Sequence, residues 1–261
     1  MLLLQVNAKT LEVPGLPASL DGLSIAHLSD LHMTGRVAPD YFHSVVDLVN
    51  EMQADLVAVT GDLVDREACI DWLPETLGRL ESRLGVYYVL GNHDKKVDVA
   101  RLRRTLGASG LIDLAGQWSV LDLDDEQILL GGNERPWFSA ASEACDCPVD
   151  ANAPAFRILL AHTPDEYAWA RERRFDLMLA GHTHGGQIAL PLLGPIVCPS
   201  RFGVKYASGV FHEPPTVLHV SRGASADVPI RWNCPPEITR LVLRCPTLAT
   251  PASTAAVNAS A

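Results

Sequence analysis

The sequence predicts an α/β fold, and three observations support this class. Apolar runs at 23–29 and 55–60, typical of buried strands, are followed by the acidic residues Asp30 and Asp62. Apolar residues at a helical spacing over 39–53 lie between the two runs and complete a βαβ unit. In the second half of the chain, short strand-like runs predict a second, more antiparallel sheet.

The later elements follow in order along the chain. We expect helices at 72–84, 97–106 (closed by Gly107) and 164–172, and strands at 86–90, 118–123, 127–130, 156–160, 177–180, 215–220 and 238–243. Polar motifs follow several of these strands. The candidate functional side chains are therefore expected at the carboxyl ends of strands, where ligands bind in open α/β sheets. The Pro- and Gly-rich stretch 190–209 has no periodicity, and its apolar residues either form a lid or pack in an ordinary way.

The composition indicates a chain with a sizeable core. With 261 residues, of which 48% are hydrophobic, we expect one domain over residues 1–245. Residues 246–261 are small and show no periodicity, which predicts a disordered tail. A formal net charge of -10 repels a phosphate backbone, so extended nucleic-acid binding is not expected.

The sequence predicts a cytoplasmic protein without a transmembrane segment. The apolar run at residues 1–4 is too short for a signal-peptide core and far too short to span a bilayer. The six cysteines show no regular framework, so reduced thiols are the simplest expectation. Cys145 and Cys147 lack a second close pair, which favours loop thiols over zinc ligands. Peripheral contact with a membrane stays open.

Five short motifs with metal-binding side chains recur in one order along the chain. They are Asp30-Leu31-His32, Gly61-Asp62-Leu63-Val64-Asp65, Gly91-Asn92-His93-Asp94, Ala161-His162 and Gly181-His182-Thr183-His184. Carboxylates, an amide and imidazoles suit divalent Mn, Fe, Zn, Ni or Co, with manganese as the first expectation. A single motif of this kind is more typical of a turn, but five in succession at strand ends predict a metal site. The donors are too many for one ion, so two ions are predicted.

The spacing of the motifs suggests how the donors share these ions. Asp30 and His32 lie two residues apart and can project to the same side. The carboxylate of Asp62 has two oxygens and can bridge metals roughly 3.5–4 Å apart. The remaining predicted donors are Asn92, His162, His182 and His184. The histidines outside the motifs are expected to be structural, namely His27, His43, His212 and His219.

At these motifs the chain resembles the calcineurin-like metallophosphoesterases, whose signature it matches in order and residue type from Asp30 to His184. The resemblance implies a four-layer α/β/β/α sandwich of two mixed β-sheets flanked by helices. It implies one metal bound by Asp30, His32, Asp62 and His184, and a second bound by Asp62, Asn92, His162 and His182. It also implies that His93 contacts the phosphate and protonates the leaving oxygen, and that Asp65 orients its ring.

These implied roles agree with the chemistry of phosphoryl transfer. A hydroxide that bridges the two ions is the expected nucleophile, because metal coordination lowers its pKa towards neutrality. An imidazole has the pKa range of a general acid, and pairing with Asp65 favours the protonated form of His93.

Differences and further matches place the chain within this superfamily. Purple acid phosphatases have Gly and Tyr where this chain has His32 and Asp65, so that branch is not expected. Asp65-Arg66 resembles the Asp-Arg pair of serine/threonine protein phosphatases, but Glu67 and Asp94 depart from their pattern. Arg66 is therefore either a phosphate ligand or a solvated surface residue.

A closer resemblance is to bacterial phosphodiesterases of the YkuE type, some relatives of which cleave UDP-2,3-diacylglucosamine. The matching segments are 26–32, 181–187, 221–223, 229–231 and 236–238. We therefore expect a dinuclear phosphohydrolase acting on a diester or pyrophosphate bond of a small molecule, which includes nucleotide-linked lipids.

The alternatives are a catalytically silent metal-binding scaffold and a phosphomonoesterase or nuclease of the same fold. The intact His93 argues against a silent scaffold, which would not need an acid for the leaving group. No basic stripe or added DNA-binding domain supports a nuclease. Substrate, metal identity and oligomeric state stay open.

Overall fold

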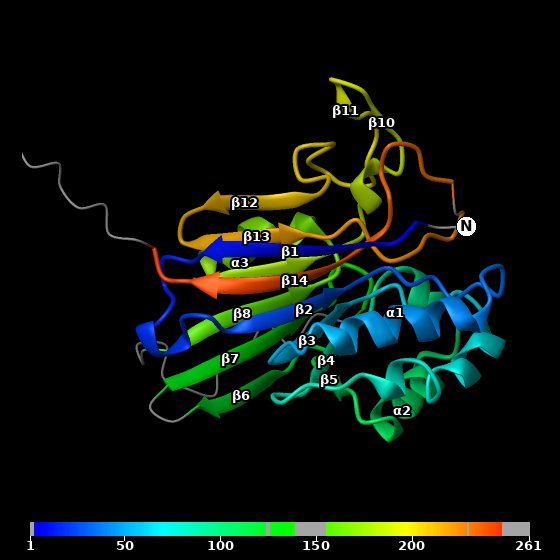
Figure 1. The fold of residues 1–261 in the computed structure, drawn as a ribbon, viewed down its shortest axis with the longest axis horizontal. Helices are drawn as coiled ribbons and strands as arrows, with labels where there is room; N and C mark the ends of the chain where they lie inside the picture. The colour runs from blue at the N-terminus through cyan, green and yellow to red at the C-terminus, as the bar shows by residue number, and fades with distance from the viewer. Residues whose placement is uncertain (1–2, 124–125, 139–154, 229, 247–261) are drawn as a thin grey trace, which may run out of the picture.

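The computed structural model describes residues 3–123, 126–138, 155–228 and 230–246. In this part of the chain, two six-stranded β-sheets pack face to face, with helices against their outer faces (Figure 1). The expected four-layer α/β/β/α sandwich of two mixed sheets is confirmed.

The first sheet carries the strands that precede the first three motifs. Its strands are β1 (Gln5–Glu12), β2 (Ser24–Leu28), β3 (Leu56–Thr60), β4 (Val86–Val89), β5 (Ile112–Asp113) and β14 (Glu237–Arg244). Their order in the sheet is β1-β14-β2-β3-β4-β5. Strands β2 to β5 run parallel, β14 is antiparallel to β2, and β1 is parallel to β14.

The second sheet carries the strands that precede the last two motifs. Its strands are β6 (Trp118–Leu123), β7 (Glu126–Asn133), β8 (Phe156–Ala161), β9 (Leu177–Ala180), β12 (Gly209–Glu213) and β13 (Thr216–Val220), in the order β12-β13-β9-β8-β7-β6. The antiparallel character expected for this sheet holds only for its edge strands, because β13, β9, β8 and β7 are parallel. The strand expected at 238–243, β14, belongs instead to the first sheet.

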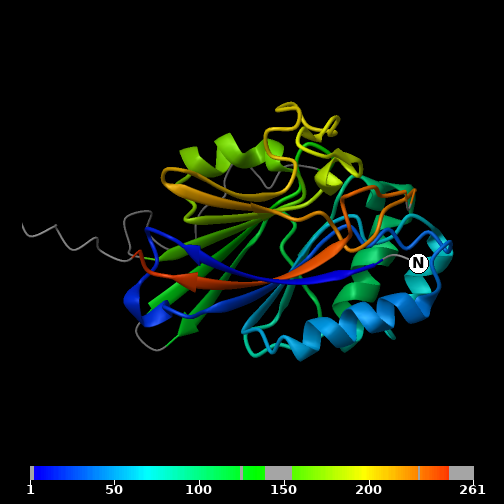
Figure 2. The same cartoon turned by 45° about the horizontal axis from the view of Figure 1, so that its top comes forward.

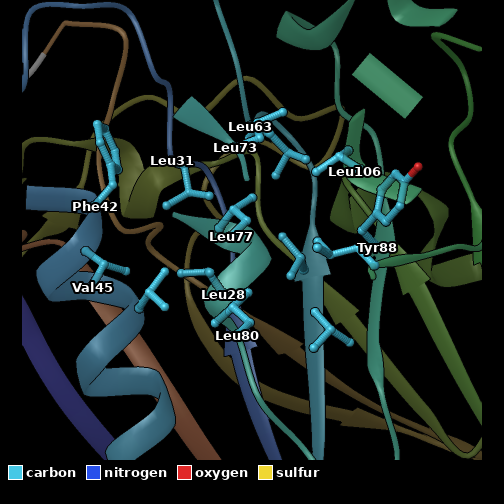
Figure 3. Close-up of a cluster of buried hydrophobic side chains, with 14 of the residues drawn as sticks. Leu28, Leu31, Phe42, Val45, Leu63, Leu73, Leu77, Leu80, Tyr88 and Leu106 are labelled. Carbon is cyan, nitrogen blue, oxygen red and sulfur yellow. The ribbon is translucent and has the colours of Figure 1, made fainter. Parts of the chain in front are cut away.

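Within the part of the chain that the structure describes, three α-helices cover the sandwich: α1 (Pro39–Glu51), α2 (Val99–Ala108) and α3 (Tyr167–Glu172). Phe42 and Val45 of α1 and Leu106 of α2 converge with Leu28 and Tyr88 on the outer face of the first sheet (Figure 3). Helix α3 packs on the second sheet. Figure 2 shows α1 and α3 on opposite sides of the paired sheets, so the two sheets form the inner layers.

Two predicted helices differ from the structure. The segment 72–84, predicted as one helix, contains the last residue of the 3₁₀ turn Glu67–Trp72 and the whole of the short 3₁₀ turn Leu77–Arg79. Pro74 has no N–H to donate and Gly78 disfavours a helix, so the apolar spacing was not sufficient. Helix α2 does not close at Gly107 but continues to Ala108, and the chain then turns at Gly110 with φ +89°.

The remaining short elements connect the layers. They are the hairpin strands β10 (Ala189–Leu190) and β11 (Gly194–Pro195) and the 3₁₀ turns Ala18–Leu20, His93–Lys96, Pro164–Glu166 and His184–Gly186. Among the described residues, no helix combines the length and apolar character needed to cross a membrane. The expected loop thiols Cys145 and Cys147, and the expected tail beyond Pro246, lie outside the described residues.

Candidate metal centre

The predicted ligands lie at the carboxyl ends of strands in both sheets. In the first sheet, β2 leads to Asp30 and His32, β3 to Asp62 and β4 to Asn92; in the second, β8 leads to His162 and β9 to His182 and His184. Parallel strands present their carboxyl ends at one edge, so the two sheets deliver these side chains to one place.

Four buried side chains, Asp30, His32, Asp62 and His184, form a first cluster whose candidate ligand atoms all lie within 4.8 Å of one another. His32 Nε2 lies 3.1 Å from His184 Nε2 and 3.5 Å from Asp62 Oδ2. His184 Nε2 lies 3.5 Å from Asp30 Oδ1. Two imidazole nitrogens and two carboxylates directed at one point fit the donor set of a divalent metal.

A second cluster consists of Asp62, His162 and His182. His162 Nε2 lies 3.2 Å from Asp62 Oδ2 and 3.2 Å from Asn92 Oδ1. A single oxygen of Asp62 therefore faces a histidine of each cluster. This arrangement fits a carboxylate shared between two cations.

Hydrogen bonds behind the rings orient two of the histidines. His162 Nδ1 donates to the carbonyl oxygen of Thr60 at 2.7 Å, which leaves Nε2 without a proton in the neutral ring. His32 Nδ1 lies 2.7 Å from Asp65 Oδ2, which directs its Nε2 in the same way. A hydrogen bond at Nδ1 holds the orientation of the ring and leaves Nε2 as the nitrogen that can bind a metal.

Five of the predicted ligands have a left-handed backbone. Their φ angles are 54° for Asp30, 45° for His32, 54° for Asp62, 71° for His182 and 52° for His184. None of these residues lies in a strand. The two-residue spacing therefore brings the ligands together through tight turns, and not through strand alternation as the sequence argument assumed. Each left-handed residue other than Gly carries a conformational cost.

Asp94 holds two of the ligand loops together. Its buried carboxylate accepts the backbone N–H groups of Asp62 at 3.0 Å, Leu63 at 2.8 Å, Val64 at 3.0 Å and Gly91 at 2.8 Å. Burial and the nearby Asp62 raise the pKa of Asp94 to about 7, while the backbone donors act in the opposite direction. In the sequence Asp94 is only a marker that distinguishes subfamilies, whereas in the structure it bridges two loops.

Asp65 lies between two histidines and a lysine. Its Oδ1 is 2.5 Å from both His93 Nδ1 and Lys96 Nζ, and its Oδ2 contacts His32. Burial opposes ionisation, but His32, His93 and Lys96 hold the pKa of Asp65 well below its usual range. The carboxylate is therefore placed to orient His93, and Lys96 is a partner that the sequence analysis did not identify.

The electrostatics leave neutral imidazoles in both clusters. Burial lowers the pKa of His182 to about 4 and that of His184 to about 3, so both rings offer lone pairs at neutral pH. Burial also acts on His162, but the carboxylate of Asp62 raises its pKa to about 9. A cation at the second cluster would therefore displace a proton from His162.

Two histidines expected to be structural, His27 and His219, are buried and hydrogen-bonded to each other through their Nδ1 atoms at 2.8 Å. Lys9 Nζ lies 3.3 Å from His219 Nε2, and His27 Nε2 lies 2.9 Å from Thr60 Oγ1. An ammonium group only donates, so these bonds run from Lys9 towards Thr60. The chain of bonds ends at the residue whose carbonyl orients His162.

The clusters open into a cleft of about 230 Å³. Besides predicted ligands and His93, it is lined by residues that sequence reasoning missed, namely Gln187, Pro199, Asp227 and Val228. The ring of Trp137 lies 4.9 Å from the ring of His182 and 5.4 Å from that of His162. Trp137 follows the end of β7 closely, so its position after a strand was the one available signal. Arg66 is exposed and does not line this cleft.

Comparisons with known proteins show the family of the chain. The calcineurin-like phosphoesterase family model matches residues 23–186. The metallophosphoesterase YkuE of Bacillus subtilis is 28% identical over 93% of this chain and 86% of its own length. Phosphodiesterase YaeI of Escherichia coli is 30% identical over 84% of this chain and 81% of its own length.

A solved structure supports the fold. The NAD nucleotidase NadN of Haemophilus influenzae superposes with a TM-score of 0.51 at 16% identity, over 77% of this chain and 50% of that one. The class defined by the fold and the clustered donors is that of metal-dependent phosphoric ester hydrolases. The chain belongs to the calcineurin-like phosphoesterase family.

Proposed function

We propose that the protein is a dinuclear metal-dependent phosphodiesterase that acts on a small-molecule phosphate ester. The observation that carries this proposal is the position of Asp62, whose Oδ2 faces a histidine in each of two donor clusters. We assign one ion to Asp30, His32, Asp62 and His184 and the other to Asp62, Asn92, His162 and His182. Manganese is the first metal to test.

Two divalent ions bound there would supply a hydroxide nucleophile and offset the charge of the phosphoryl group. The residues of the chain provide orientation and proton transfer. His93 lines the cleft, and its Nδ1 is held 2.5 Å from Asp65. With Nδ1–H donating to a carboxylate, the imidazolium form of His93 is the form that carries a proton on Nε2, and this proton is available to the leaving oxygen. The small cleft favours small esters over polymers, and the name of phosphodiesterase YaeI supports a diester.

The test begins with protein stripped of metal and reloaded with single metals. We expect hydrolysis of bis(p-nitrophenyl) phosphate to return and to exceed hydrolysis of p-nitrophenyl phosphate. The reverse preference would favour a phosphomonoesterase. No turnover of these esters or of UDP-diacylglucosamine with any metal would favour the silent scaffold.

The role of His93 is tested with His93→Asn. We expect this variant to retain two metals by elemental analysis, yet to lose on the order of 100-fold or more in kcat on esters with poor leaving groups, because the acid is gone. Esters with good leaving groups should be affected much less. His43→Asn is the matched control, because His43 lies on α1 and contacts Arg79. Equal kcat values for the two variants would remove His93 from the mechanism.

A further inference from the structure

One projecting part of the molecule gathers much of its exposed apolar surface. Of the thirteen large apolar side chains that are exposed in the described residues, eight lie in two short segments, 188–197 and the described part of 228–232, which is 228 and 230–232. We call these two segments the apolar protrusion. Leu192 is fully exposed, and Leu193 and Val197 are 80% and 73% exposed. Ordinary packing, one of the two interpretations of the 190–209 stretch, therefore does not apply to these residues.

The protrusion is built as one unit. Strands β10 and β11 pair antiparallel through Ala189↔Pro195 and Leu190↔Gly194. The second segment is joined to this hairpin by a β-bridge between Ile188 and Trp232. In this bridge Ala189 N donates to Trp232 O at 3.0 Å, and Trp232 N donates to Gln187 O at 3.0 Å. The exposed side chains are thus held on a paired backbone.

The shape and charge of the protrusion limit what can cover it. Figure 1 shows β10 and β11 projecting away from the two sheets, and Figure 2 shows the same from a second direction. Residues 187–199, which include the hairpin of the protrusion, contain no Asp, Glu, Lys, Arg or His. Arg231, in the second segment, donates to the carbonyl oxygens of Arg222 and Ser225. A convex, uncharged tip can enter hydrocarbon without removing any charge from water. The exposed fraction falls to 52% at Trp232, beside the base of the hairpin, where an indole ring suits a membrane–water interface.

We propose that the apolar protrusion docks the protein onto a zwitterionic lipid bilayer by inserting its tip below the headgroups. A bilayer accommodates a convex apolar tip, whereas a second protein would need a matching cavity. The net charge of -10 opposes binding to an anionic membrane, which selects zwitterionic lipid as the surface. The protrusion therefore acts as an interfacial anchor and does not span the membrane.

The protrusion adjoins the cleft directly. Gln187 and Val228 line the cleft, and the exposed Ile188 follows Gln187 in the chain. A docked molecule therefore holds the mouth of the cleft close to the lipid headgroups. In combination with the proposed phosphodiesterase function, on which this step rests, the favoured substrate is an amphiphile with its phosphate ester at the membrane surface. The docking itself does not depend on that function.

Co-sedimentation of the full chain with phosphatidylcholine vesicles tests the docking. We expect the protein to sediment with these vesicles in 1 M salt, because apolar insertion is not screened by ions. The double variant Leu192→Asp/Leu193→Asp should bind at least about tenfold less, because each introduced carboxylate must leave water. Ile112→Asp, at an exposed apolar position on β5, is the control and should bind like the unaltered chain. Both variants should hydrolyse soluble bis(p-nitrophenyl) phosphate normally.

Three outcomes would overturn the inference. The first is absence of vesicle binding by the unaltered chain, and the second is equal binding by the double variant. The third is a dimer in light scattering that dissociates in the double variant, which would assign the protrusion to a second copy. Vesicle binding without hydrolysis of any ester would instead refute the proposed function and leave the docking intact.

Discussion

Replacement of Asp94 by Asn should weaken both the fold and the metal centre, because one carboxylate accepts four backbone N–H groups from two ligand loops. Oδ1 accepts from Leu63 and Val64, and Oδ2 accepts from Asp62 and Gly91. An Asn side chain keeps one acceptor oxygen. The NH₂ group of Asn takes the place of the other oxygen and faces two backbone N–H groups. Both sides are donors, so no hydrogen bond forms between them.

The expected loss follows from these two donors. A buried N–H group without a partner costs about 1–3 kcal/mol, so two of them cost about 2–6 kcal/mol. The substitution also removes a buried charge whose pKa is raised to about 7, which offsets part of this loss. We expect the free energy of unfolding to fall by about 2–4 kcal/mol. Metal affinity should fall as well, because Asp62 and Asn92 lie in the loops that Asp94 joins.

Urea unfolding at pH 7 and calorimetric titration of the stripped protein with Mn²⁺ measure the two effects. Asp98→Asn is the matched control, because Asp98 caps α2 by accepting one N–H bond, from Arg101, and Asn is an equally good cap. Its unfolding free energy should stay within about 0.5 kcal/mol of the unaltered chain. Equal losses in the two variants, or unchanged Mn²⁺ affinity in Asp94→Asn, would refute the reasoning.

Two further predictions concern packing and pH. Gly132→Ala should lower the free energy of unfolding by about 3 kcal/mol, because its Cβ would overlap the carbonyl of Leu114, whereas Gly107→Ala in α2 meets nothing within 4 Å and should raise it by about 1 kcal/mol. Urea titrations of both variants check this, and a Gly132→Ala protein as stable as Gly107→Ala would contradict it. Burial raises the pKa of Asp176 from 3.8 to about 6, so the folded state holds a proton that the unfolded state releases. Stability should therefore fall as pH rises from about 4 to about 6, by up to about 3 kcal/mol, and Asp176→Asn should remove this part of the slope in unfolding curves taken across that range.

The sequence predicted the strands that are buried on both faces and the edge strand β6, and it missed the edge strands β1, β5 and β12. Apolar runs such as those of β2, β3 and β9 are specified by their own composition. Strand β1 is mostly exposed and pairs only with β14, so its residues carry no continuous apolar signal. The sheet to which β14 belongs was also not predictable, because strand partners are chosen by tertiary packing and not by local periodicity.

The donors were predictable because each directly follows a strand, and the parallel strands of each sheet end at one edge. Trp137 and Asp227 were not, because their positions depend on loops that return from elsewhere in the chain. Lys96 lies in the same 3₁₀ turn as His93, but its contact with Asp65 depends on tertiary packing. The exposure of Leu192 was also not predictable, because the apolar residues of this stretch are compatible with ordinary packing as well as with a lid.

The left-handed backbone at five proposed ligands has a consequence for the evolution of this chain. In that conformation a side chain costs about 1 kcal/mol or more relative to Gly. A descendant released from selection for metal binding would gain stability by replacing these residues with Gly or Asn. Among relatives, such replacements at positions 30, 32, 62, 182 and 184 would mark lineages that have lost the centre. Retention of all five side chains would mark lineages in which selection has maintained it against folding stability.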